Sequence, residues 1–390
     1  MNFKYYLPFF VSILVLVSCK KQINNQVIKT ATNYLVVSGN ITPGDTTVIN
    51  LSRMLSVNDT AASKAETDAT VTIEGSQGGV YLLTSKNNGN YVSVPLNLPS
   101  AQNYRVKIIT SDGKQYASDF VPLKNSPAID SVNYVVNYNS GVQINVNTHD
   151  ANNNTHYYRW DYAETYVIHS AFESHYMEVN HDTTAIRPAD QEIYQCWAND
   201  ISSSILTGSS VALSKDLIRD QLITQIPSNS EKLHIRYSIQ VQQYALTADA
   251  FNYFNLLKKN TEQLGGIFDP QPSELTGNVH CLSNVNEPVV GYITAGAVSK
   301  MRIFIDSSQL PSWIPATPYG GCTADTLLYI YVEPVSNPTI PPLITNQVAE
   351  FIYKDIEIPL DQIIGGYTAS FPQCVDCTLR GTNKQPAFWK

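Results

Sequence analysis

The chain has 390 residues and a formal net charge of −8, and only 15% of its residues are charged whereas 24 are tyrosines. This length is sufficient for two or three domains of ordinary size. The acidic balance and the lack of any run of Lys or Arg argue against a nucleic-acid partner. Few charges and many aromatic side chains are typical of an exported β-rich protein rather than a cytosolic helical enzyme.

Residues 1–18 are predicted to be a signal peptide. Lys4 supplies the positive charge, and residues 7–17 form a mainly apolar run that is too short to span a bilayer as a helix. The run ends in Leu16-Val17-Ser18-Cys19, which resembles a bacterial lipobox. We therefore expect cleavage before Cys19, a palmitate-type membrane anchor on its thiol, and a lipidated tether over residues 19–32. The alternative is an ordinary export signal with an incidental cysteine.

Lys20 and Lys21 follow the lipobox. In known bacterial lipoproteins an Asp at these positions favours retention in the inner membrane, so the outer membrane is the predicted location. The segment also lacks the acidic tag that marks some lipoproteins for display on the cell surface. The sequence thus leaves the choice between the cell surface and the periplasmic face undecided.

Residues 33–124 are predicted to form an immunoglobulin-like β-sandwich. Short apolar runs follow one another with almost no helical period, and Gly78-Gly79, Asn88-Gly89 and Asp112-Gly113 are turn formers between runs. Many short strands with such spacing are typical of a sandwich. The expected strands are residues 34–37, 47–51, 71–74, 80–84, 91–94, 104–110 and 116–121.

Residues 125–390 are predicted to form a second, β-sandwich-like domain with an inserted helical and loop region at about 170–285. Its first strands flank the turn Asn139-Ser140-Gly141, and a long aromatic strand over residues 157–168 contains Trp160, a residue type that fills sandwich cores. Within the insertion, Ser214 is placed to cap a short helix that carries Leu217 and Leu222.

One clear helix is predicted from Ala248 to Leu264. Thr247 is the expected N-cap and Gly265-Gly266 ends the helical pattern. An apolar stripe at helical spacing indicates that the helix docks on a sheet, and we interpret it as core rather than as a cofactor contact. The stripe consists of Ala250, Tyr253, Phe254, Leu257, Thr261 and Leu264.

Of the six cysteines, five remain when Cys19 is set aside: Cys196, Cys281, Cys322, Cys374 and Cys377. An oxidising compartment favours two disulfides and one free thiol, whose connectivity does not follow from sequence. We expect Cys196 to pair with Cys281, and Cys322 with Cys374 or Cys377. The Cys374-x-x-Cys377 spacing also occurs in metal and redox sites, but neither a second such pair nor a βαβ context accompanies it.

Two patterns suggest metal ligands and fail on geometry. His169, His175 and His181 are spaced by six residues, which would leave neighbours about 20 Å apart along a strand and on different faces of a helix. Asp150-x-Asn152-x-Asn154 matches the start of a calcium loop, but Thr155 replaces the Gly of the sharp turn. We therefore predict neither a metal site nor a cofactor, and a polar hairpin tip at Asp150.

The sequence identifies no catalytic residue, and it does not decide whether the protein is an enzyme. The chain contains no Gly-x-Ser-x-Gly, no His-Glu-x-x-His and no phosphate-binding glycine loop. A catalytic triad is recognised by geometry rather than by sequence order, so one assembled from distant residues is compatible with the sequence. Carboxylate pairs such as Glu173 and Glu178 are too generic to indicate a glycosidase.

Several segments resemble a known family. They are Phe268 to Asn278, Val290 to Ala295, Cys374 to Thr378, Gly381-Thr382 and Pro386 to Trp389. These segments are similar to the Bacteroidota lipoproteins grouped as domain of unknown function 4249, and residues 34–41 and 129–132 fit the same family. The resemblance thus extends over nearly the whole mature chain. It implies a two-domain, β-rich envelope lipoprotein, commonly encoded beside a TonB-dependent outer-membrane receptor, without a known activity or catalytic residues.

Asp269, Pro270, Gln271 and Pro272 form a stiff extended turn, because each Pro fixes its own φ and restricts the residue before it. This turn is either a partner-contact loop or a rigid connector. The favoured hypothesis is a non-enzymatic accessory subunit of a TonB-dependent receptor that aids cargo capture or gating. The alternatives are a surface hydrolase acting on peptide or glycan, and a carbohydrate-binding module.

Overall fold

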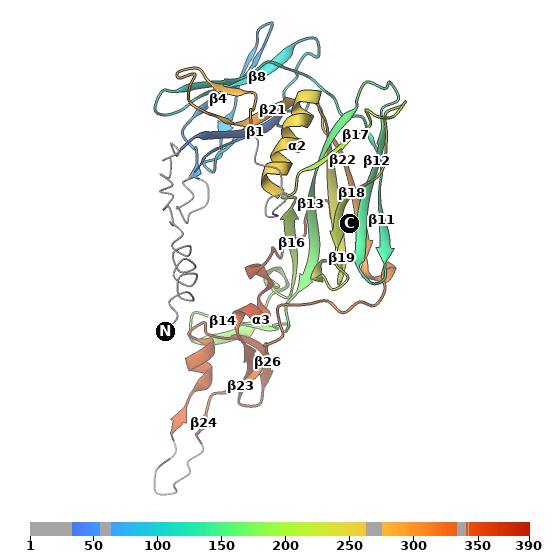
Figure 1. The fold of residues 1–390 in the computed structure, drawn as a ribbon. Helices are drawn as coiled ribbons and strands as arrows, with labels where there is room; N and C mark the ends of the chain where they lie inside the picture. The colour runs from blue at the N-terminus through green and yellow to red at the C-terminus, as the bar shows by residue number, and fades with distance from the viewer. Residues whose placement is uncertain (1–32, 55–63, 263–274, 334–340, 342) are drawn as a thin grey trace, which may run out of the picture.

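The computed structural model describes residues 33–54, 64–262, 275–333, 341 and 343–390. Strands dominate these ranges, and they form two β-sandwiches and a small third unit (Figure 1). The predicted fold class, mainly β with successive sandwich domains, is confirmed. The signal peptide, the tether with Cys19 and the Asp269 to Pro272 turn lie outside the described residues.

The first sandwich contains twelve strands, listed here with their bounds. They are β1 (Leu35–Ile41), β2 (Val48–Arg53), β3 (Lys64–Ala65), β4 (Thr70–Gly75), β5 (Val80–Leu82), β6 (Thr84–Ser85), β7 (Asn90–Val92), β8 (Asn103–Ile109), β9 (Gln115–Ser118), β10 (Val121–Pro122), β20 (Val279–Cys281) and β21 (Val290–Ala295). One sheet has the order β21-β1-β2-β7-β6 with β3 on β2, and the other β20-β9-β8-β4-β5 with β10 on β8. Alternation along β1 buries Leu35 and Val37 in the core and leaves Val36 and Ser38 on the outer face.

Two strands of this sandwich return from far along the chain. β21 pairs in parallel with β1, from Val36 opposite Val290 to Ile41 opposite Ala295, and β20 pairs antiparallel with β9. Both strands fall within the second domain predicted from sequence, so the predicted boundary at residue 124 needs this correction. The reason is physical: a strand of three to six residues carries little information about its partner, because pairing energy comes from the neighbouring strands.

The second sandwich is built from eight strands: β11 (Ile129–Asn137), β12 (Gly141–His149), β13 (Tyr157–His169), β16 (Gln195–Ile201), β17 (Leu206–Ser209), β18 (Leu217–Ile226), β19 (Arg236–Ala245) and β22 (Ser299–Asp306). Its sheets have the orders β11-β12-β18 and β16-β13-β19-β22, with β17 on β13. Trp160 of β13 is fully buried between them, as predicted.

Leu217 to Ile226 is a strand and not the short helix expected after Ser214. β18 pairs antiparallel with β12 through two register shifts, and its Ile218, Ile223 and Ile226 are buried. Burial against a neighbouring strand therefore overrides the local helical spacing of these residues.

A third unit, which we call the C-terminal module, lies at the end of the second sandwich far from the first (Figure 1). It combines the hairpin β14 (Tyr176–Val179) and β15 (Thr183–Ile186), inserted between β13 and β16, with elements from residues 325–375. Those elements are β23 (Asp325–Leu328), β24 (Tyr331–Val332), β25 (Ile344–Thr345), the π-helix η5 (Val348–Ile352), β26 (Ile358–Ile363), β27 (Gly366–Ser370) and α3 (Pro372–Val375). Among the described residues, the remaining short helical turns are η2 (Ala189–Gln191), η3 (Glu231–Leu233), η4 (Ser307–Gln309) and η6 (Cys377–Leu379).

Two disulfides stabilise this part of the chain: one lies within the C-terminal segment, and the other connects that segment to the second sandwich. Cys196 of β16 pairs with Cys377, and Cys322 pairs with Cys374, one of the two partners expected for it. The predicted pairing of Cys196 with Cys281 is wrong, because Cys281 lies on β20 in the core of the first sandwich, where its thiol is free and buried.

The predicted long helix is α2 (Ala248–Glu262), and residues 263–264 lie outside the described ranges. The backbone amide of Ala250 donates to the Thr247 hydroxyl at 3.2 Å, which confirms the N-cap. Ala250, Tyr253 and Phe254 are buried as expected, whereas Thr261 of the predicted stripe is exposed. Within the described ranges, no helix has the length and apolarity required to cross a bilayer.

Gln243 connects the second sandwich to the chain segment that enters it. Its fully buried side chain accepts from Trp160 Nε1 at 2.9 Å and donates to Ser126 Oγ, Pro127 O and Thr148 Oγ1 at 3.1, 3.1 and 3.0 Å. A Gln243→Leu substitution leaves several buried polar groups without partners, so we expect it to lower the free energy of unfolding by about 2–4 kcal/mol. The control is Gln242→Leu, whose side chain lines a surface cleft. Equal effects of the two variants in denaturant titrations would contradict this role.

Asp150 holds the turn after β12. Its carboxylate accepts backbone N–H groups of Asn152, Asn154 and Thr155, each at 2.9 Å. Burial raises the pKa of Asp150, but these hydrogen bonds outweigh it and leave the pKa below its usual value. A depressed carboxyl pKa stabilises the fold above the unfolded pKa, and this contribution is lost as the pH falls through the folded value. Asp150→Ala should therefore cost about 1–3 kcal/mol at pH 7 and progressively less below about pH 4. Chemical denaturation across this pH range tests the expectation, and a cost independent of pH would refute it.

Candidate functional site, a cleft between the two sandwiches

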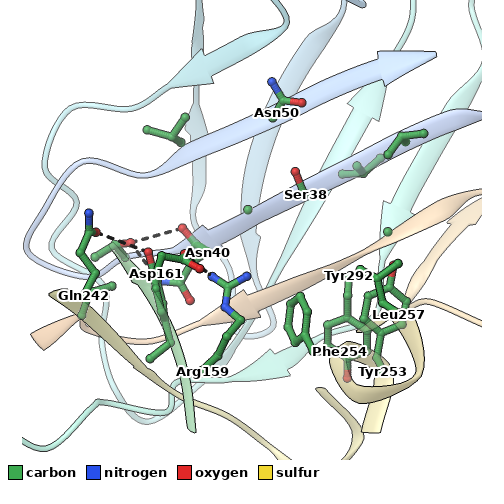
Figure 2. Close-up of a pocket in the computed structure, with 18 of the residues that line it drawn as sticks. Ser38, Asn40, Asn50, Arg159, Asp161, Gln242, Tyr253, Phe254, Leu257 and Tyr292 are labelled. Carbon is green, nitrogen blue, oxygen red and sulfur yellow. Dashed lines mark hydrogen bonds and ion pairs between the residues drawn. The ribbon is translucent and has the colours of Figure 1, made fainter. Parts of the chain in front are cut away.

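A cleft of about 650 Å³ lies between the two sandwiches. One wall is the outer face of β1, β2 and β21, and the other is formed by β13, β19 and Lys300 of β22, with α2 at one end (Figures 1 and 2). Ser38 and Asn40 point out of β1 into this space, and Asn50 does so from β2. The strand alternation that builds the first core thus also supplies a row of polar side chains to the cleft.

The helix end of the cleft is aromatic. Tyr253 and Phe254 of α2 contact Tyr292 of β21. The ring centroid of Tyr292 is 5.0 Å from that of Tyr253 and 6.3 Å from that of Phe254. Burial raises the pKa of Tyr253 to about 12 and also raises the pKa of Tyr292, so both phenols are neutral near pH 7. This cluster fixes the helix to the first sandwich, and the helix in turn packs on Tyr157 and Tyr244 of the second.

Arg159 lies between the aromatic end and the polar end (Figure 2). Its guanidinium carbon is 4.4 Å from the ring centroid of Tyr244 and 4.6 Å from that of Phe254, and Nη2 donates to Asp161 at 3.0 Å. Nε is buried without a hydrogen-bond partner among the described residues. The two rings and the carboxylate therefore hold a planar cation in one orientation at the middle of the cleft.

The other end of the cleft is polar and bridges the two sandwiches. Lys300 Nζ lies 2.9 Å from Asp45 Oδ2, and this hydrogen bond lowers the pKa of Asp45. Asn40 donates to Gly296 O at 2.9 Å and accepts from Thr294 Oγ1 at 2.8 Å. The cleft therefore presents apolar rings at the helix end and paired charges at the opposite end.

The chain segments that cross between the sandwiches keep the cleft walls in place. Lys124 N–H donates to Ala295 O at 2.8 Å, Ser126 N–H to Ala297 O at 3.0 Å, and Gly296 N–H to Ile41 O at 2.9 Å. Gly296 has φ +154°, and a Cβ there would lie 1.8 Å from Lys124 O, so only Gly fits. The two crossings form a short ladder that connects the walls of the cleft.

The nearest approach to a hydrolytic triad in the described residues is structural. Ser210 is fully buried and donates to Asp216, and His156 Nδ1 is 3.4 Å from Ser210 Oγ. Tyr158 also donates to Asp216. In a catalytic triad the histidine lies between serine and carboxylate, whereas here the serine occupies the middle position and is closed to substrate. This group does not activate a nucleophile.

The structure separates the histidines that were considered together. His169 contacts Gln195 at 3.1 Å, His175 pairs with Asp361 at 2.8 Å, and His181 lies on the turn between β14 and β15. The sequence analysis did not identify the cleft residues. Two of these residues could have been found from sequence. Arg159 and Asp161 are charged residues on one face of an otherwise aromatic strand, and charged residues are rarely buried in a core.

Two β-sandwiches with a cleft between them define this chain as a mainly β, multidomain protein. The chain belongs to the family described as Domain of unknown function (DUF4249), whose model matches residues 20–302. The match covers the first sandwich, the cleft and the second sandwich as far as Arg302 within β22, and it ends before β23 to β27 of the C-terminal module. Among curated proteins, no sequence matches the chain.

Solved structures with similarity to this chain include the following three. A two fibronectin type-III domain segment from chicken tenascin is 10% identical over 54% of this chain and 90% of its own, with a TM-score of 0.16. The chicken CNTN1 FN1-FN3 domains are 14% identical over 55% and 63%, with a TM-score of 0.18. Pullulanase from Anoxybacillus sp. LM18-11 is 11% identical over 54% and 24%, with a TM-score of 0.15. Superpositions this poor carry no argument about function.

Phe254 is the side chain that contacts both Arg159 and Tyr292. We expect Phe254→Ala to lower the free energy of unfolding by about 2–4 kcal/mol, because it leaves a cavity under Arg159 and separates the helix from β21. Asn252→Ala, at an exposed position of the same helix, should change it by about 0.5 kcal/mol or less. Thermal and denaturant unfolding provide the measurement, and similar values for both variants would show that α2 does not hold the sandwiches together.

Proposed function

We propose that this chain is a non-enzymatic lipoprotein of the outer membrane that captures a cargo molecule in the inter-domain cleft for a TonB-dependent receptor. The observation that carries the proposal is the cleft between the sandwiches, in which two aromatic rings and Asp161 hold the guanidinium of Arg159. Family membership and the lipobox-like sequence before Cys19 support the membrane anchor and the receptor partner. A lipid anchor holds a domain at the surface of the membrane in which such a receptor is embedded.

Binding is favoured over hydrolysis by the chemistry of the cleft. Its two carboxylates are each engaged by a cation, Asp45 by Lys300 and Asp161 by Arg159, whereas a glycosidase requires an acid and a base that face the scissile bond. Among the described residues that line the cleft there is neither His nor Cys. The rings of Tyr253 and Phe254 pack on each other, so they do not present open faces for sugar stacking.

The receptor partnership is tested by purification from gently solubilised outer membranes. A tagged chain should carry a TonB-dependent receptor with it, identified by mass spectrometry. Replacement of residues 1–18 by an export signal with an Ala-x-Ala cleavage site, combined with Cys19→Ala, should release the chain from the membrane fraction and reduce this recovery. Repeated isolation of the wild-type protein as a free monomer would refute the partnership, and membrane retention of the processed Cys19→Ala chain would refute the lipid anchor.

The role of the cleft is tested by filling it. Ser38 is exposed on the cleft wall, so Ser38→Trp should occupy the space without disturbing the core of the first sandwich. Native mass spectrometry of protein purified from its own membranes should show a bound molecule on the wild-type chain and not on Ser38→Trp. Thr70→Trp, which adds the same bulk to an exposed position of β4, is the matched control. Retention of cargo by Ser38→Trp would place the binding site elsewhere.

A further inference from the structure

The C-terminal module brings together three ligand-type side chains that are distant in sequence. Glu178 and His181 belong to the β14–β15 hairpin, and Asp355 belongs to the turn after η5. One carboxylate oxygen from each acid and one imidazole nitrogen all lie within 4.8 Å of one another. The Glu178 carboxylate also accepts the backbone N–H of His181, which orients it toward the imidazole.

The two distances from the imidazole nitrogen are close to those between neighbouring ligands of a metal ion. His181 Nδ1 is 3.7 Å from Glu178 Oε1 and 3.5 Å from Asp355 Oδ2. Hydrogen bonds from an imidazole nitrogen close to about 2.7–3.2 Å, so both separations are too long for good ones. Ligand atoms about 2.0–2.1 Å from a tetrahedral Zn²⁺ lie about 3.3 Å apart, close to both observed values.

The other exposed histidine–carboxylate pairs of the chain behave differently. His149 lies 2.7 Å from Asp130 and His280 lies 3.2 Å from Asp119, each with one carboxylate at hydrogen-bonding distance. His175 has two carboxylate neighbours, but Asp361 faces Nδ1 at 2.8 Å while Glu173 faces Nε2 at 3.7 Å. Two acids on opposite ring nitrogens do not share one ion. In this group of pairs, His181 is the one whose single nitrogen faces two carboxylates at ligand spacing.

The charge of the C-terminal module favours a cation at this place. Over its two segments, residues 176–186 and 325–375, the sequence has one basic residue, Lys354, and eight acidic ones. Mutual repulsion of carboxylates in such a module favours a bound cation. The acidic residues are Glu178, Asp182, Asp325, Glu333, Glu350, Asp355, Glu357 and Asp361.

We propose that Glu178, His181 and Asp355 bind one Zn²⁺-type transition-metal ion that clips the β14–β15 hairpin to the turn after η5. The single imidazole and two carboxylates suit a borderline divalent cation, whereas Ca²⁺ and Mg²⁺ take all-oxygen ligand sets. Water completes the coordination at this exposed position. The site is separate from the inter-domain cleft and independent of the function proposed for it.

Isothermal titration with Zn²⁺ tests the site on the mature chain with both disulfides formed, a tag free of histidine, and prior removal of metal by a chelator. The wild type should bind one equivalent, and Zn²⁺ should raise its Tm. His181→Ala and Asp355→Asn should each weaken binding at least about 10-fold, and the Tm increase should disappear. Both residues are exposed, and circular dichroism verifies that the variants are folded.

His175→Ala is the matched control, since it removes an exposed histidine with two carboxylate neighbours from the same hairpin region. Its Zn²⁺ affinity should equal that of the wild type. A millimolar excess of Ca²⁺ or Mg²⁺ should not displace Zn²⁺. The proposal is overturned if the wild type binds no Zn²⁺, if His181→Ala binds as tightly as the wild type, if His175→Ala loses binding equally, or if Ca²⁺ competes on equal terms.

Discussion

The parallel pairing of β21 with β1 is the interaction on which the rest of the architecture depends. It completes one sheet of the first sandwich with a strand that the chain reaches only after most of the second sandwich. The same strand carries Tyr292 to the helix and leads through Gly296 directly into β22. One strand thus closes a sheet, forms a cleft wall and fixes the distance between the two sandwiches. A parallel pair requires a long crossover connection, and here the connection contains most of the second sandwich.

The C-terminal module is held by a different kind of constraint. Its main buried cluster is small, with Leu327, Val348, Ile352, Tyr367 and Ala369, and a core of this size contributes little stability by itself. The two disulfides compensate by linking Cys322 to Cys374 and by attaching the module to β16 through Cys196 and Cys377. Large cores stabilise the sandwiches, whereas covalent bonds stabilise the module, which agrees with an oxidising compartment.

Local features were predictable from sequence, and long-range ones were not. Helix α2 follows from a cap at Thr247 and an apolar spacing that are contained within one short segment. Trp160 was placed correctly because a large aromatic residue in an alternating strand has few alternatives to burial. The partners of β20, β21 and Cys196 depend on which distant strands lie side by side, and β18 became a strand because β12 was available to pair with it. The cleft belongs to neither sandwich alone, so no single motif encodes it.

The late position of β20 and β21 in the sequence also determines when the first sandwich can be completed. A chain that is synthesised N-terminus first presents β1 and β9 long before their partners β21 and β20. The outer edges of both strands stay unpaired until most of the second sandwich has been made, and unpaired edges are templates for aggregation. β22, which completes the second sandwich, follows β21 within a few residues, so both sandwiches reach their full strand complement almost simultaneously. The two sandwiches are therefore separate in space, but neither has all of its strands until the same late stage of synthesis.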